Sequence, residues 1–141
     1  MSIPKHLRLE FVTPERAIAH EEVDEVGLPG EEGDFGVLPG HAPLLASLRT
    51  GTMWYRRGGE RIHAFVAGGF AEVVPDRVSV LAQVAERADD IDDQRAEAAK
   101  RRAEERMRAP VSEVDFERAR IALIRAMTRL DVSRHARRRR G

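Results

Sequence analysis

The sequence contains no cysteine, which excludes disulfide bonds and thiolate metal sites anywhere in the 141-residue chain. It also lacks any apolar run near the ~18 residues that a membrane-spanning helix requires. The five histidines have no pair at a spacing expected for a zinc site on one helix. No serine or cysteine nucleophile pattern accompanies His41, so a catalytic role for this histidine is disfavoured. These absences favour a binding or mechanical protein over an enzyme.

Aromatic residues make up 5% of the chain, and none lies beside the arginine-rich segment at residues 135–141. We expect this tail to be disordered. A protein that binds nucleic acid through the tail is a minor alternative, because no aromatic side chain is present there for bases to stack on. The N-terminal segment has neither the apolar core of a signal peptide nor the composition of a transit peptide, so we expect a soluble protein without a targeting segment.

The formal net charge of zero conceals two halves of opposite sign. Residues 1–88 carry 9 Lys and Arg against 13 Asp and Glu, whereas residues 89–141 carry 15 against 11. An acidic first part (−4) and a basic second part (+4) indicate two modules with different partners.

Apolar residues in the first module alternate with polar ones, as Leu7, Leu9 and Phe11 show. The same period of two recurs in residues 62–66 and 78–84, and it is typical of half-buried strands. Turn-forming pairs such as Gly68-Gly69 separate these segments at roughly ten-residue spacing. The pattern predicts a β-sandwich or barrel.

A helical pattern begins near Asp89, and no glycine or proline occurs between Asp89 and Met107. Pro110 predicts a break, and Ser112 with Asp115 predicts the N-terminal cap of a second helix that runs to about Arg134. The expected apolar stripe of the first helix has small side chains: Ile91, Ala98 or Ala99, Ala103 and Met107. The second helix presents Phe116, Ala119, Leu123, Ala126 or Met127, and Leu130. Such a hairpin buries little area, so we expect it to be marginally stable and able to open.

Arginines recur on one face of each predicted helix. Arg95 and Arg102 share a face of the first, and Arg125 and Arg129 share a face of the second. If the helices pack antiparallel, up to four guanidiniums converge, and such groups bind phosphate in a bidentate manner. Asp92 and Glu86 could accept hydrogen bonds from a ribose or a base. Spacing alone favours a simpler interpretation, a solvated charged face with pairs such as Glu97–Arg101.

Glycines at positions 27, 30, 33 and 36 suggest a phosphate-binding loop, but the sequence lacks the Gly-Lys-Ser/Thr ending of that motif. Tight turns between strands explain them better. The neighbouring Asp34 and His41 form a candidate polar docking edge.

The chain resembles the epsilon subunit of the bacterial F-type ATP synthase over roughly residues 5–133, and four ordered segments carry the match. They are EGDFGVLPGHAPLL (32–45), FVAGGFAEV with RVSVLAQVAER (65–73 and 77–87), IDDQRAEAAKRRAEERM (91–107) and VDFERARIALIRAMTRL (114–130). The resemblance implies an α+β fold: a ten-stranded antiparallel β-sandwich in residues 1–86, followed by an antiparallel helix hairpin in residues 87–134.

The resemblance further implies a non-catalytic rotor subunit in the central stalk. Its expected partners are the gamma subunit and the c-subunit ring, the latter through Asp34 and His41. The hairpin would also reach the alpha and beta subunits when extended, and would then inhibit ATP hydrolysis. No nucleic-acid partner is implied. The implied location is the cytoplasmic face of the bacterial inner membrane, with membrane contact only through the complex.

Some members of the family bind ATP as a regulatory ligand on the folded hairpin, with no catalytic cofactor. The matching positions here are Glu86, Ile91, Asp92, Arg95, Ala96, Arg102, Arg125 and Arg129. All eight hold the residue type that the ATP-binding pattern needs, so the resemblance favours a nucleotide site over a solvated face. A rotor subunit with a vestigial nucleotide site remains the alternative. The arginine-rich tail departs from the family pattern.

Overall fold

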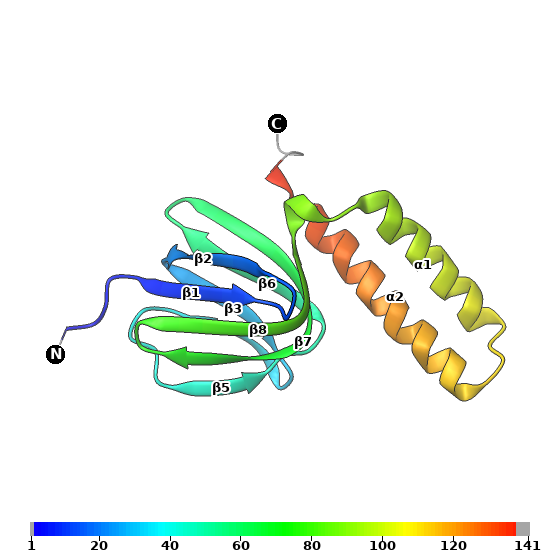
Figure 1. The fold of residues 1–141 in the computed structure, drawn as a ribbon, viewed down its shortest axis with the longest axis horizontal. Helices are drawn as coiled ribbons and strands as arrows, with labels where there is room; N and C mark the ends of the chain where they lie inside the picture. The colour runs from blue at the N-terminus through cyan, green and yellow to red at the C-terminus, as the bar shows by residue number, and fades with distance from the viewer. Residues whose placement is uncertain (1, 138–141) are drawn as a thin grey trace.

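The alternating segments of the first module form eight strands in the computed structural model, which describes residues 2–137. A two-helix hairpin projects from one end of them, and the N-terminal segment lies at the other end (Figure 1). The strands are β1 (Leu7–Val12), β2 (Ala17–Val23), β3 (Glu25–Gly30), β4 (Gly33–Val37), β5 (Leu44–Ser47), β6 (Gly51–Arg57), β7 (Glu60–Val74) and β8 (Arg77–Arg87).

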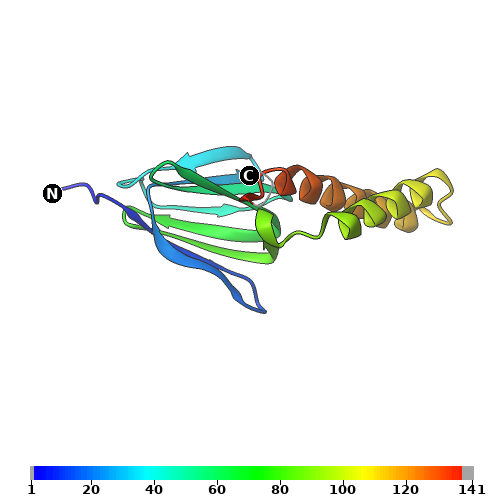
Figure 2. The same ribbon diagram turned by 90° about the horizontal axis from the view of Figure 1, so that it is seen from above.

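Hydrogen bonds join the strands in the order β2-β1-β8-β7-β6-β3-β4, with β5 paired to β7. The sheet folds over into two layers (Figure 2), and β7 takes part in both because it pairs with β6 and with β8. The apolar residues of the period-two pattern fill the space between the layers. The largest fully buried side chains there are Tyr55, Phe11, Leu7, Leu9, Leu28 and Met53.

Two details of the expected sandwich are corrected. The described residues contain eight strands rather than ten, and the Gly68-Gly69 pair lies within β7, in one continuous register with β8, instead of forming a turn between strands. Both glycines have positive φ, 73° and 108°, a backbone conformation that glycine adopts without strain. The sheet is also not purely antiparallel, because β1 pairs with β8 in parallel.

The first helix begins later than the composition predicts. A short 3-10 helix, η1 (Ala88–Asp90), follows β8, and α1 (Asp93–Arg108) begins after Asp92, whose carboxylate accepts a hydrogen bond from the Arg95 amide. The acidic run therefore supplies a cap instead of extending the helix. The predicted cap of α2 (Glu113–Ser133) is confirmed, since the Ser112 hydroxyl accepts from the Asp115 amide at 3.0 Å.

Small side chains form the contact between the two helices. Ala96 and Ala103 are buried on α1, and Ala119 and Ala126 are buried on α2. The sequence predicted that Ile91 belongs to this stripe, but the structure places it elsewhere. It precedes α1 and is buried against the sandwich in a second apolar cluster with Phe65, Ala67, Ala88, Val132 and Ala136.

The C-terminal end of α2 lies beside the sandwich, against β7, β6 and η1, whereas α1 packs on α2. Only the first three residues of the predicted tail, residues 135–141, are described by the structure. His135–Arg137 pack against β7 and η1, and residues 138–141 lie outside the described residues. Within residues 2–137, neither helix is both long and apolar enough to span a bilayer.

Replacing Gly69 by alanine should destabilise the sandwich severely. A Cβ atom there would lie 2.1 Å from the Leu81 carbonyl oxygen, at a φ of +108°. Overpacking together with backbone strain predicts a loss of about 2–5 kcal/mol in the free energy of unfolding, measured by urea titration. Gly59→Ala is the matched control, because that position has open space around it. Equal losses in the two variants would contradict this explanation of why position 69 requires glycine.

Candidate functional site

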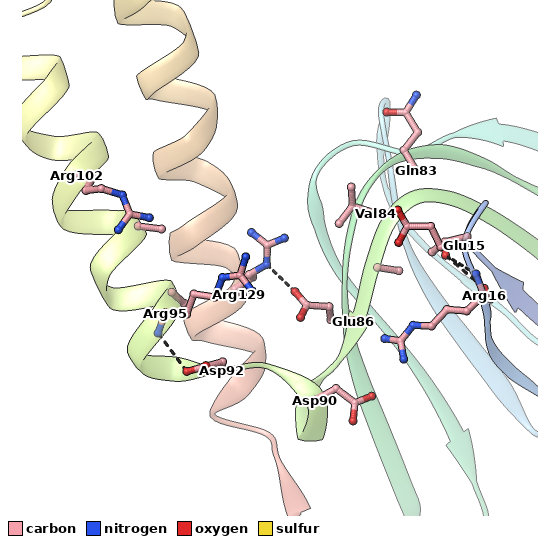
Figure 3. Close-up of a pocket in the computed structure, with 14 residues that line it drawn as sticks. Glu15, Arg16, Gln83, Val84, Glu86, Asp90, Asp92, Arg95, Arg102 and Arg129 are labelled. Atoms are coloured by element: carbon pink, nitrogen blue, oxygen red, sulfur yellow. Dashed lines mark hydrogen bonds and ion pairs between the residues drawn. The ribbon is translucent and has the colours of Figure 1, made fainter.

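A cavity of about 600 Å³ lies between the hairpin and the sandwich. Figure 3 shows Arg95 and Arg102 on α1 and Arg129 on α2 extending into it, with Glu86 of β8 facing Arg129. Its volume falls within the range typical of small-ligand pockets, about 300–1,000 Å³. The lining residues are Thr13, Glu15, Arg16, Gln83, Val84, Ala85, Glu86, Asp90, Asp92, Arg95, Ala96, Ala99, Arg102 and Arg129.

Arg129 joins the hairpin to the sandwich across the cavity. Its Nε donates a hydrogen bond of 2.7 Å to Oε1 of Glu86 (Figure 3). The guanidinium also lies over the ring of Phe65, 4.3 Å from the centroid. Both side chains of the ion pair are about one-third exposed, so the pair is stronger than a fully solvated one but still open to competition from an anionic ligand.

The first turns of α1 form the opposite wall. Asp92 caps the helix, and Arg95, Ala96 and Arg102 follow it on the face directed toward the cavity. Ala96 is buried and leaves room next to the arginines. The spacing argument therefore correctly predicts that Asp92, Arg95 and Arg102 share one side of the helix.

Two of the expected ligand residues do not line the cavity. The Ile91 side chain is buried in the apolar cluster next to β7, although its neighbours Asp90 and Asp92 both line the cavity. Arg125 lies one turn before Arg129 on α2, and its Nε is buried without a hydrogen-bond partner among the described residues. Three of the four predicted guanidiniums therefore converge here.

Apart from Glu86, sequence reasoning missed the contribution of the sandwich. Thr13, Glu15 and Arg16 come from the turn between β1 and β2, and Gln83 comes from β8. A turn at Thr13-Pro14 is visible in the sequence. Its position opposite α1 depends on the parallel pairing of β1 with β8, a long-range contact that leaves no local signal.

The charged groups that line the cavity are balanced, with four arginines and four carboxylates. Arginines suit a phosphate chain, and carboxylates suit the hydroxyl and amine groups of a nucleoside. Residues 2–137 contain no cluster of three His, Asp or Glu side chains that could hold a metal ion. The residue types therefore fit a small ligand that carries both an anionic chain and hydrogen-bond donors.

The predicted docking edge lies outside this cavity. Asp34 is exposed on β4 and forms an ion pair with Arg49. His41 is half-buried, and its Nδ1 donates to the Ala42 carbonyl oxygen at 2.6 Å. The adjacent Gly40 amide donates to the Pro75 carbonyl in the β7–β8 turn, so His41 lies at the end of the sandwich opposite to the end where β8 leads into the hairpin.

Comparison with known proteins gives the same division of the chain. Residues 6–88 match the family model for the beta-sandwich domain of the ATP synthase delta/epsilon chain. Residues 89–134 match the model for the long alpha-helix domain of the same chain. The chain is 51% identical over 132 residues to the ATP synthase epsilon chain of Nitratidesulfovibrio vulgaris (strain DP4), covering 94% of this chain and 98% of the relative.

A further relative and a solved structure are also similar to this chain. The ATP synthase epsilon chain of Herpetosiphon aurantiacus is 48% identical, covering 91% of this chain and 94% of the relative. A chain in the cryo-EM structure of Euglena gracilis mitochondrial ATP synthase (OSCP/F1/c-ring in rotational state 1) superposes with a TM-score of 0.81 and 25% identity, covering 91% of this chain and 81% of that chain. The chain therefore belongs to the ATP synthase delta/epsilon family.

Proposed function

We propose that this chain is the epsilon-type rotor subunit of an ATP synthase central stalk, and that its hairpin binds ATP as a regulatory ligand. The observation that carries the nucleotide proposal is the cavity lined by Arg95, Arg102 and Arg129. Its walls come from β8, α1 and α2, so the complete set of groups exists only while the hairpin is folded against the sandwich. ATP would therefore bind the folded form and stabilise it.

A ligand that binds only one form shifts the equilibrium by an amount that depends on its concentration. At a hundredfold excess over Kd the shift is about 2.7 kcal/mol. The hairpin is suited to control on this scale, because its interface is built from alanines such as Ala103 and Ala119. The Arg129–Glu86 ion pair that connects it to the sandwich is partly exposed and thus modest in energy.

In this proposal the hairpin without ATP can open and extend toward the alpha and beta subunits, where it inhibits ATP hydrolysis. The chain itself contributes no catalytic group. It acts from the cytoplasmic face of the bacterial inner membrane, as a peripheral part of the ATP synthase.

The outer face of the sandwich offers a docking surface for the gamma subunit. Phe70 and Leu81 are cross-strand neighbours on β7 and β8, and their side chains are 46% and 42% exposed. Leu45 of the adjacent β5 is 69% exposed. Exposed apolar clusters of this kind mark protein–protein contacts. Asp34 and His41 are the proposed contacts to the c-subunit ring.

A variant of Arg102 should lose ATP affinity. Arg102→Ala removes a guanidinium from the cavity wall, and we expect an increase in Kd of about tenfold or more, typical of a lost charge-assisted contact. Isothermal titration of the full chain with ATP and with ADP measures it. Arg101→Ala is the matched control, since Arg101 is an exposed neighbour on α1 that does not line the cavity. Equal Kd values for the two variants would exclude the cavity as the site.

A second candidate is the same rotor role with a vestigial nucleotide site. Two observations favour it: Arg129 is already paired with Glu86 and packed on Phe65, and Arg125 does not line the cavity. The absence of binding at millimolar ATP in the titration above would support this candidate.

Removing the hairpin should increase ATP hydrolysis by the assembled synthase. We expect complexes built with residues 1–88 to hydrolyse ATP several times faster than complexes with the full chain at low ATP, because no helix remains to extend. The sandwich carries its own apolar core and the proposed docking faces, so assembly should be retained. Equal rates from equally assembled complexes would contradict an inhibitory role for the hairpin.

A further inference from the structure

The chain after α2 turns back onto the sandwich instead of leaving it. The His135 amide donates to the Val132 carbonyl at 2.9 Å, and the Ala136 amide donates to the Ser133 carbonyl at 3.0 Å. These two turns direct residues His135–Arg137, which we call the C-terminal strap, against β7 and η1. The strap therefore contacts the point where the sandwich leads into the hairpin.

Each residue of the strap makes a different contact. The His135 ring stacks on the His63 ring of β7, with centroids 3.7 Å apart and planes 11° apart. Ala136 is fully buried in the apolar cluster that also contains Ile91 and Phe65. Ring stacking and apolar burial therefore hold the strap on the sandwich independently of its charged contacts.

Arg137 adds an ionic clamp. Its backbone amide donates to Oδ1 of Asp89 at 2.7 Å, and its Nε donates to Oδ2 of the same carboxylate at 3.1 Å. A second guanidinium nitrogen reaches Oε1 of Glu60 at 2.6 Å. Asp89 belongs to η1 and Glu60 to β7, so one arginine ties the end of α2 to both elements.

This clamp depends on charge and is open to solvent. The hydrogen bond to Asp89, followed by the charge of Glu60, raises the pKa of the Arg137 guanidinium, so its charge does not change near neutral pH. The Arg137 side chain is 51% exposed, and its two partners are 35% and 38% exposed. Salt therefore screens the clamp.

The strap lies beyond the part of the chain that the family models describe, because the helix-domain match ends at residue 134. It lies at the junction of α2 with β7 and η1, where the hairpin is attached to the sandwich. A contact that exists in the folded form and is broken on opening shifts the equilibrium between the two forms.

We propose that the C-terminal strap is a salt-sensitive latch that holds the hairpin folded against the sandwich. The latch sets the fraction of folded chains in the absence of ligand. Its consequence for ATP rests on the proposed function: the apparent Kd rises in inverse proportion to the folded fraction. The latch itself does not require nucleotide.

Energy transfer within the full chain tests the latch. Trp54 is the only tryptophan, and the chain has no cysteine, so a single acceptor can be attached at Met127→Cys on the exposed side of α2. Transfer from Trp54 decreases when the end of α2 leaves the sandwich. We expect Arg137→Ala to lower the ratio of folded to extended chains about three- to tenfold, the range for two partly exposed ion pairs.

Arg134→Ala is the matched control. Arg134 pairs with Asp131 within the same helical turn, and this pair does not cross to the sandwich. The control should transfer energy like the parent chain. Adding salt should reduce transfer in the parent and the control more than in Arg137→Ala. Arg137→Lys, which keeps the positive charge between Asp89 and Glu60, should retain part of the transfer that Arg137→Ala loses.

Two outcomes separate this inference from the proposed function. If Arg137→Ala and Arg134→Ala show the same transfer as the parent without nucleotide, the latch is wrong, whatever ATP does. If Arg137→Ala loses transfer but none of the chains binds ATP, the latch is supported and the nucleotide site is wrong. Loss of transfer together with a proportional increase in the Kd for ATP supports both.

Discussion

The hairpin is held to the sandwich through one end of α2, and every inference about the cavity and the movement of the hairpin depends on that attachment. The buried contact consists of Ile91 and Ala88 from the connection, Phe65 and Ala67 from β7, and Val132 and Ala136 from the end of α2. Arg129 and Glu86 add an ion pair beside it. Because α1 packs on α2, the position of α1 beside the cavity follows from this single attachment.

The two modules differ in how firmly they are built. The sandwich buries large side chains such as Tyr55, Phe11 and Met53 between its layers. The hairpin buries alanines between its helices and exposes Ile121 and Met127 on α2. At about 25 cal/mol per Å² of apolar surface, small side chains contribute little stability. Because the sandwich is firmly packed and the hairpin is weakly held, a ligand or a partner can control the position of the hairpin.

Much of this arrangement is predictable from the sequence, for physical reasons that are local. Period-two alternation gives the strands, Pro110 gives the break between the helices, and Ser112 with Asp115 gives the cap. The shared face of Asp92, Arg95 and Arg102 follows from helical geometry. Resemblance to a family gave the order of the two modules, which the matches to residues 6–88 and 89–134 confirm.

The remaining features depend on long-range packing. The parallel pairing of β1 with β8 brings Arg16 to the cavity, and nothing near Arg16 in the sequence indicates it. Gly68-Gly69 has the composition of a turn, but the partner strands on both sides carry β7 straight through. Ile91 has the spacing of a helix stripe. Because α1 begins only at Asp93, Ile91 lies before the helix, and its side chain packs in the apolar cluster.

Hydrogen–deuterium exchange of the full chain, with and without ATP, tests the central claim most directly. The account predicts that amides of α1 and α2 exchange much faster than those of the sandwich without ATP. With ATP the helices should become protected, and the core strands should be unchanged. Helices that exchange as slowly as the sandwich in both conditions would contradict a hairpin that opens under nucleotide control.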